Sequence, residues 1–550
     1  MMSSWWSKRN LFFFALVLLA AKLWLVSSHY VMVREAPHDD KLFITQAYHL
    51  LSGNWLGPYD QFVMIKGPFY PLFIALAWWL NIPLLTAQQL LYWLAALAAV
   101  WAVYPVVQKK WLLPLLFAFL LLNPFSYNYP GVGRIFREFV YASLGLLVFA
   151  CYLGLHVRFN SSWKRASIWS AGAGIALAAF WHTREESIWL VPVLFLLMLP
   201  GLLHLRRDRI AVLLGLYLLP WLILLAAHFT LKSINASQYG VPAVIELRTD
   251  EFESAYGGLL RIKSDKWRQF YPVVQDVREK AYAVSPAFSE LKPHLEGGAG
   301  QNWKNLAGSD DIPAAFFIWA FRDAVAAAGH AKNGTDALQF YATIGQEIDQ
   351  ACESGKLECQ TRVTSLVPSW HQDYNKLLLP TFFDVLQQEA TFSNLLISKN
   401  ETSFAFKSTM LLYASVLWDK LLPTQLKDIE AKPEYYRRLN KEKRKILLDI
   451  GKGYKKMMPL LFIAALAFFL FRAINSIRKR ELSLFTAASA AALTGTCAVA
   501  FILTLLAITS YSEIQRPMQS VYPMVLLFIV STILDAFSFT EQKSIMPEQG

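Results

Sequence analysis

Residues 8–41 read KRNLFFFALVLLAAKLWLVSSHYVMVREAPHDDK and set the pattern for the rest of the chain. The apolar run Leu11–Val26 is close to the roughly 20 residues that a helix needs to cross a bilayer. Lys8 and Arg9 precede it, and positive charge beside a span favours the cytoplasmic side. The run therefore predicts an uncleaved signal anchor, followed by a loop on the outer side that contains His38-Asp39-Asp40.

The composition extends this interpretation to the whole chain. Of its 550 residues, 55% are hydrophobic, 15% are aromatic and only 17% are charged, and the mean hydropathy is +0.33. A soluble protein carries about 25% charged residues, so a soluble globule is excluded, as are a disordered chain and a fibrous repeat. The net charge of +12 gathers beside apolar spans and shows no basic face interleaved with aromatic residues. This favours contact with membrane lipids and argues against nucleic acid.

The sequence predicts an α-helical polytopic membrane protein of about 10 transmembrane helices plus juxtamembrane helices. The predicted spans are Leu11–Val26, Leu84–Val107, Trp111–Leu122, Phe139–Val157, Ala166–Trp181, Ile188–Leu205, Ile210–Leu231, Met457–Phe471, Leu484–Thr509 and Met518–Phe537. If each crosses once, every dense basic loop falls on one side. We expect a bacterial inner-membrane protein with both termini in the cytoplasm.

Three regions follow from this topology. Residues 1–231 form an N-terminal membrane region with a catalytic first outer loop at 27–83, residues 232–456 form a mainly helical extracytoplasmic (periplasmic) domain, and residues 457–550 form a C-terminal membrane region. Within the first outer loop, Phe69–Leu80 is apolar but is expected to lie in the membrane interface. In the outer domain, Cys352 and Cys359 favour a small disulfide loop over free thiols or a zinc site.

Each short outer loop carries Arg or Lys together with a carboxylate or His. These residues are His38, Asp39, Asp40, Lys66, Arg134, Arg137, Glu138, His182, Arg184, Glu185, Glu186, Glu513 and Arg516. Charges at membrane level are costly unless they are paired, so they tend to mark sites. Arginine in particular suits phosphate, because its planar fork donates two parallel hydrogen bonds. The alternative is that these residues are solvated helix ends or structural ion pairs.

The order of these motifs resembles the GT-C superfamily of membrane glycosyltransferases, which includes lipid A aminoarabinose transferases and protein O-mannosyltransferases. Asp39-Asp40-Lys41-Leu42-Phe43 stands in the position of that superfamily's acidic pair, and Lys66-Gly67-Pro68 in that of its Lys-x-Pro element. Arg516-Pro517, with Tyr522-Pro523 further on, looks like a spaced version of its C-terminal Arg-Tyr-x-x-Pro element. The chain departs from the pattern in its second acid, which is Asp rather than Glu, and in placing the large outer domain before the last three spans.

The resemblance implies transfer of a sugar from a polyprenyl-phosphate carrier to a glycan, lipid or protein acceptor on the outer face. We expect an inverting single displacement with Asp39 as the general base and Asp40 as the alternative. The expected substrate-binding residues are His38, Lys66, Arg134, Arg137, Glu138, His182, Arg184, Glu185 and Arg516, with Lys66 and Arg516 nearest the leaving phosphate. No cofactor is expected; a divalent cation is conceivable but not favoured.

Three other functions remain open at this point. A lipid-linked glycan polymerase or ligase would use similar chemistry. A transporter or flippase of a lipid-linked saccharide would also be polytopic, but the sequence shows no paired inverted halves and its charges lie at one face rather than at mid-bilayer. A non-catalytic scaffold would need neither Asp39 nor Asp40.

Overall fold

The computed structural model describes residues 6–127, 133–159, 161–203, 210–361, 366, 368–393, 395, 402–425, 433–510 and 512–545. Within them the chain is helical, and its β pairing is confined to the bridges Val31–Leu421, Arg34–Phe404 and Ile262–Cys359. Three parts of the predicted topology lie outside the described residues. They are Gly131 and Val132 of an outer loop, Arg206, Arg207 and Arg209 of a basic loop, and Leu205 at the end of a span. The predicted α-helical membrane fold is confirmed.

Ten helices correspond to the predicted spans. They are α1 (Lys8–Val26), α4 (Leu84–Val103), α5 (Leu112–Leu121), α6 (Glu138–Phe159), α7 (Trp163–Trp181), α8 (Leu190–Leu203), α9 (Ile210–Tyr239), α20 (Glu434–Lys479), α21 (Leu484–Thr509) and α22 (Tyr522–Ile545). Seven described helices are long and apolar enough to cross a membrane, and the count reaches about ten only when α5, α7 and α8 are added. The predicted interface segment forms α3 (Phe69–Trp79), which has only 11 residues.

Local sequence signals set where several of these helices begin and end. Ser162 accepts a hydrogen bond from the Arg165 amide at the start of α7, and Ser483 accepts one from Thr486 at the start of α21. These are N-caps, which satisfy amides that have no partner within the helix. At the C-terminal end of α20, Arg480 takes a left-handed conformation with φ of 54° and ends the helix.

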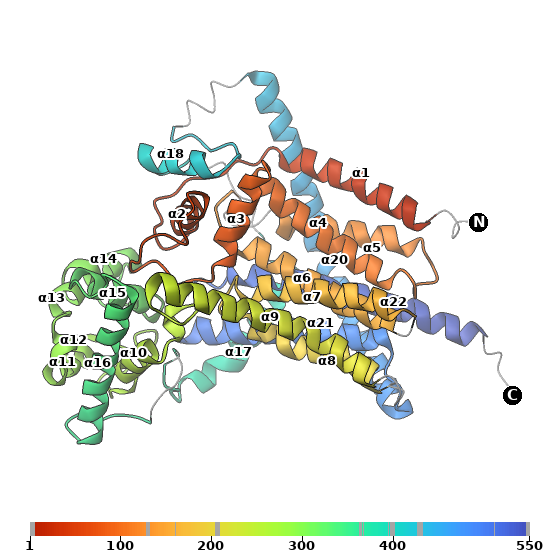
Figure 1. The fold of residues 1–550 in the computed structure, drawn as a ribbon. Helices are drawn as coiled ribbons and strands as arrows, with labels where there is room; N and C mark the ends of the chain where they lie inside the picture. Colours follow the sequence, from red (N-terminus) through yellow and green to blue (C-terminus); the bar gives the residue numbers. More distant parts are fainter. Residues whose placement is uncertain are drawn as a thin grey trace.

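The membrane helices pack around α6 and α22, which are buried along most of their length. Helix α6 lies against α4, α7 and α8, while α21 lies against α22, α8 and α17 (Tyr374–Thr391). A second, smaller core is built from short helices that gather at one end of the bundle, opposite the two chain ends (Figure 1). These are α10 (Asp250–Arg261), α11 (Gln275–Val284), α12 (Pro286–Ser289), α13 (Lys292–Leu295), α14 (Gly298–Ala307), α15 (Ala314–Ala327) and α16 (Gly334–Glu353).

The region between residues 232 and 456 divides its apolar residues between the two cores. The second core draws on residues 239–357 and on Val63 and Met64 of the first outer loop. Two other helices of this region face the core of the membrane helices instead. Helix α17 contributes Val385 to that core, and α18 (Lys407–Val416) contributes Tyr413 and Val416. The domain boundaries at 231 and 456 stay a prediction. The predicted disulfide is present, between Cys352 and Cys359 at the end of α16.

A buried ion pair fastens the first outer loop to the second core. Arg322 of α15 is 1% exposed and contacts Glu246, which is fully buried and also accepts a hydrogen bond from Tyr59 of the loop. Arg322 donates further bonds to the carbonyl oxygens of Gln61 (2.9 Å) and Val63 (3.1 Å). The path of the chain toward Lys66 is thereby fixed by the outer domain.

Replacement of Arg322 by Leu should therefore destabilise the fold. It leaves the Glu246 carboxylate buried without a cation, which typically costs about 3–5 kcal/mol. Arg268→Leu is the matched control, because it removes an exposed pair with Asp310 that is worth at most about 1 kcal/mol. Thermal unfolding of the purified protein in detergent should show a large drop for Arg322→Leu and almost none for Arg268→Leu. Equal drops in the unfolding temperature of the two variants would contradict a stabilising role for the Arg322–Glu246 pair.

Candidate active site

The charged residues of the outer loops meet at the ends of five helical segments. Asp39 is the N-cap of α2 (Asp40–Leu51), Lys66 precedes α3, and Glu138 opens α6. Arg184 and Glu185 lie between α7 and η2 (Ser187–Trp189), and Arg516 is the residue before η5 (Pro517–Ser520). Ion pairs connect these segments, so residues more than 470 positions apart form one cluster.

Asp39 is held between two cations. The Lys66 ammonium donates to one carboxylate oxygen at 2.6 Å, and the Arg516 guanidinium donates to the other at 3.0 Å. Lys66 also donates to the backbone carbonyl of His38. The Asp39 side chain is 30% exposed and Lys66 is 11% exposed, so the pair reaches the surface without being freely solvated.

Electrostatics keep this carboxylate ionised. Burial alone would raise the pKa of Asp39, but the charges and hydrogen bonds of Lys66 and Arg516 outweigh burial and hold that pKa well below its ordinary value. For Lys66, burial lowers the pKa, and the attraction of Asp39 only partly opposes it. Proximity to Arg137 lowers it further. The site therefore concentrates positive charge around one accessible carboxylate.

Asp40 points elsewhere and has a different environment. It is fully buried, where it accepts two hydrogen bonds from Arg134 (3.1 and 2.5 Å) and one from the Ile135 amide (3.0 Å). Burial raises its pKa above the ordinary value despite Arg134, and the neighbouring Asp39 charge adds to the rise. Asp40 thus ties α2 to the segment before α6, whereas the Asp39 side chain remains 30% exposed.

An aromatic ring connects the two pairs. Phe136 lies 4.2 Å from the guanidinium carbon of Arg134 and 4.4 Å from that of Arg516, measured to the ring centroid. Cations are attracted to the faces of aromatic rings, so Phe136 helps to orient both arginines. Glu513 lies 3.8 Å from the other side of Arg516.

A second layer of ion pairs lies behind Lys66. Arg137 makes a two-pronged contact with Glu185, with both hydrogen bonds at 2.7 Å, and donates a third to the Thr183 carbonyl at 2.7 Å. Arg184 pairs with Glu138 at 2.7 Å and also contacts Glu186. Burial would raise the pKa of Glu185, but Arg137 overcomes it and holds that pKa low. These partly buried pairs are geometrically fixed, which suits positioning more than contact with substrate.

The two predicted histidines lie at the edge of the cluster. The His38 ring is surrounded by Phe62, Trp303 and Trp319, at centroid distances of 5.0, 4.6 and 4.6 Å. Its Nε2 lies 3.8 Å from a carboxylate oxygen of Asp323. The outer domain and the first outer loop therefore supply the surroundings of the residue that precedes Asp39.

His182 acts on the site through its backbone. Its ring lies beside His228, with 3.4 Å between nitrogens. Burial lowers the pKa of His182 to about 4, so the ring is neutral at pH 7. Its carbonyl accepts a hydrogen bond from Phe69 and lies against Gly67, where an added Cβ would come within 2.1 Å of the oxygen. Gly67 is thus needed for the close approach that places Lys66.

Three aromatic residues of the site were not predicted from the sequence. Lys66 lies 5.2 Å from the Phe43 ring and 5.5 Å from the Trp319 ring, and Phe136 lies between two arginines. Phe136 could have been suspected, since it stands between Arg134 and Arg137 in the chain. Trp319 lies about 250 positions from Lys66 on a helix of another core, and no local pattern indicates their contact.

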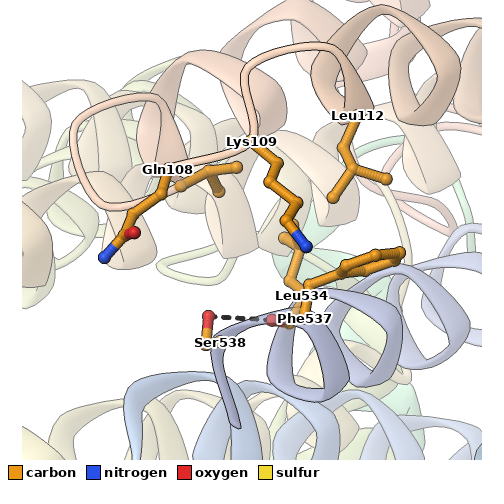
Figure 2. Close-up of a pocket in the computed structure, with 7 residues that line it drawn as sticks. Gln108, Lys109, Leu112, Leu534, Phe537 and Ser538 are labelled. Carbon is orange, nitrogen blue, oxygen red and sulfur yellow. Dashed lines mark hydrogen bonds between the residues drawn. The ribbon is translucent and has the colours of Figure 1, made fainter. Parts of the chain in front are cut away.

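Among the described residues no group of three or more His, Cys, Asp or Glu side chains is placed to hold a metal ion, and independence from metal stays a prediction. A shallow surface pocket lies between the segment after α4 and the middle of α22 (Figure 2). It is lined by Gln108, Lys109, Leu112, Leu534 and Phe537 among others, and none of the clustered site residues lines it.

Comparison with known proteins gives one structural likeness. No protein-family model and no curated protein matches the sequence. Two crystal structures of ArnT from Cupriavidus metallidurans are similar to the chain, one bound to undecaprenyl phosphate and one in the apo state. Each is 12% identical, with TM-scores of 0.31 and 0.32, and the alignments cover 96–97% of this chain and 79–80% of ArnT.

The opposite pKa shifts of the two aspartates predict opposite pH effects on stability. Asp39 has a lowered pKa in the folded state, so its stabilising effect is complete above the unfolded value of about 3.9 and is lost as the pH falls below it. The difference in thermal unfolding midpoint between wild type and Asp39→Asn should therefore shrink below about pH 4.

Asp40 provides the contrast. Its raised pKa means that the folded state binds a proton more readily than the unfolded chain, so acidification should favour wild type over Asp40→Asn. Unfolding midpoints of the three proteins in detergent between pH 7 and pH 3 would measure both trends. If the unfolding midpoints of Asp39→Asn and Asp40→Asn changed with pH in the same way, the two aspartates would not differ in environment.

Proposed function

We propose that the protein is a membrane glycosyltransferase that moves a sugar from a polyprenyl-phosphate carrier to an acceptor at the outer membrane surface. The observation that carries the proposal is the reachable Asp39 carboxylate between Lys66 and Arg516. One carboxylate between two cations, in the loops at the outer ends of the membrane helices, suits the displacement of a lipid-linked phosphate. The lipid tail of such a donor stays in the bilayer while its phosphate lies at headgroup level.

Lys66 and Arg516 are the proposed phosphate-binding residues. A phosphate oxygen carries the same charge sign as Asp39 and accepts the same charge-assisted hydrogen bonds. The two cations can therefore transfer their bonds from Asp39 to an arriving phosphate. Asp39 loses part of the attraction that lowers its pKa in that exchange, so donor binding makes it a better base.

The proposed reaction is a single displacement with inversion at the anomeric carbon. The acceptor oxygen attacks that carbon from the face opposite the phosphate, and the acceptor's proton passes to the Asp39 carboxylate. The new glycosidic bond forms as the bond from carbon to phosphate oxygen breaks. The electron pair leaves with polyprenyl phosphate, and Lys66 and Arg516 stabilise the added negative charge.

The surrounding residues are proposed to hold this arrangement. Asp40 pairs with Arg134, and the Phe136 ring packs against both Arg134 and Arg516. The position of Arg134 therefore helps to set that of Arg516. Arg137 with Glu185 and Arg184 with Glu138 support Lys66 and the start of α6 from behind. His38 and His182 border the site, where His38 faces the outer domain that we expect to select the acceptor.

The cellular setting is part of the same proposal. The chain is a multi-pass membrane protein. We propose a bacterial inner membrane, with the termini in the cytoplasm, the outer domain in the periplasm and no metal requirement. The acceptor is a glycan, a lipid or a protein.

The decisive experiment compares Asp39→Asn with wild type in membranes supplied with a panel of radiolabelled polyprenyl-phosphate sugars. Loss of the base should lower kcat by about 100-fold or more, while the KM for donor changes little. Glu513→Gln is the matched control, because its carboxylate lies 3.8 Å from Arg516 and its side chain is 55% exposed. Full transfer by Asp39→Asn at equal expression would refute the proposal.

Removal of either phosphate-binding cation should also impair transfer. Loss of one donor that stabilises the leaving charge typically costs about 10²- to 10³-fold in kcat. We therefore expect losses of this order for Lys66→Met and Arg516→Met, with partial recovery in Arg516→Lys because the charge remains. Arg268→Met, on the outer domain, should keep full activity. A loss confined to KM would mean that these cations bind donor but do not act on the leaving group.

A further inference from the structure

The first half of α20 is unusually basic for a segment that continues directly into an apolar span. Residues 434–456 contain nine Lys and Arg against three Asp and Glu. The same helix then runs without a break through Met457 to Lys479. On the predicted topology the basic half lies on the outer side, where Lys and Arg beside spans are normally depleted. The proposed transfer reaction uses none of these residues.

The helix presents three distinct faces. Its buried face is formed by positions three or four apart, which are Asn440, Lys443, Leu447, Gly451, Tyr454 and Met458. The exposed basic residues are Arg437, Arg438, Lys441, Lys445, Lys452 and Lys456. At about 100° of rotation per residue, these six fall within an arc of about 100°, turned away from the buried face.

The third face is open and mostly apolar, with Glu442 and Asp449 at its border with the basic arc, where Asp449 pairs with Lys452 at 3.2 Å. Tyr435, Ile446 and Met457 are 77%, 42% and 45% exposed, and they lie between the basic arc and the buried face. A helix with adjoining apolar and basic faces is suited to the boundary between acyl chains and headgroups. Figure 1 shows α20 crossing the bundle obliquely, with its first turns projecting past α1.

The buried face fixes this surface at the outer end of α1. Lys443 donates to the Ser27 hydroxyl at 2.8 Å and lies 4.9 Å from the Trp24 ring, and Arg444 donates to the Ser28 carbonyl at 3.3 Å. Tyr454 donates to the Phe119 carbonyl at 2.6 Å. The exposed basic face is therefore held rigidly at the level where the chain leaves the membrane.

We propose that residues 434–456 form a binding surface for the anionic headgroups of bilayer phospholipids. The choice of a lipid surface rests on three features together: the clustered positive charge, the adjoining exposed apolar face and the direct continuation into a membrane span. Each Lys or Arg near an anionic membrane surface contributes about 1 kcal/mol. This surface anchors and orients the segment that precedes Asp39. Binding of lipid headgroups here does not depend on the proposed transfer reaction.

The test uses the full-length protein in neutral detergent, immobilised by a tag, with micelles that contain labelled phosphatidylglycerol or phosphatidylcholine. Wild type should retain phosphatidylglycerol selectively, and added salt should weaken the retention. In the triple variant Arg437→Gln, Lys441→Gln and Lys445→Gln, we expect retention of phosphatidylglycerol to fall at least about 20-fold. The control triple Lys266→Gln, Lys356→Gln and Lys376→Gln, on exposed positions outside α20, should match wild type.

Two results would overturn the proposal. One is equal retention of phosphatidylglycerol by wild type and the α20 triple variant. The other is binding of glycerophosphoglycerol, the headgroup without acyl chains, as tight as binding of the lipid, since the occupant would then be a soluble phosphate compound. If the triple variant fails to elute as a folded monodisperse protein, the single variants Lys441→Gln and Lys445→Gln replace it. Their retention of phosphatidylglycerol must then depend less steeply on salt than that of wild type, and an equally steep dependence would overturn the proposal.

Discussion

The contact of Asp39 with both Lys66 and Arg516 is the interaction on which the site depends. It joins the N-terminus of α2, the loop before α3 and the turn before η5, which the chain supplies from its two ends. Membrane charges must be paired, so this contact also helps to close the helix bundle at its outer end. The same pairing prepares the chemistry, because it gathers two cations where a phosphate would leave and keeps one carboxylate ionised beside them.

The outer domain supports this contact through the first outer loop and through Trp319. Arg322 and Glu246 fasten residues 59–63 to the second core, and the carbonyl of His182 leaves room only for Gly67 beside Lys66. Trp319 adds a ring against both Lys66 and His38. A disturbance of the outer domain should therefore reach the reaction through the position of Lys66, without any contact between that domain and the leaving phosphate.

The sequence predicted the spans and the gathering of outer charges, because apolar length and the side of basic loops are local properties. Each predicted span overlaps a helix, and Lys66, Arg516 and Asp39 do meet. Local patterns could not show that Asp39 and Asp40 diverge, that Phe136 lies between two arginines, or that α17 packs with the membrane helices. Those outcomes depend on tertiary packing between segments hundreds of residues apart.

The most direct measurement is the affinity of purified full-length protein for a polyprenyl phosphate and for the corresponding polyprenol, which lacks the phosphate. We predict that wild type prefers the phosphate and that Arg516→Met and Lys66→Met each lose most of this preference while still binding polyprenol. Equal affinity of wild type for the two lipids would contradict a phosphate site at Lys66 and Arg516, and with it the assignment of Asp39 as the base.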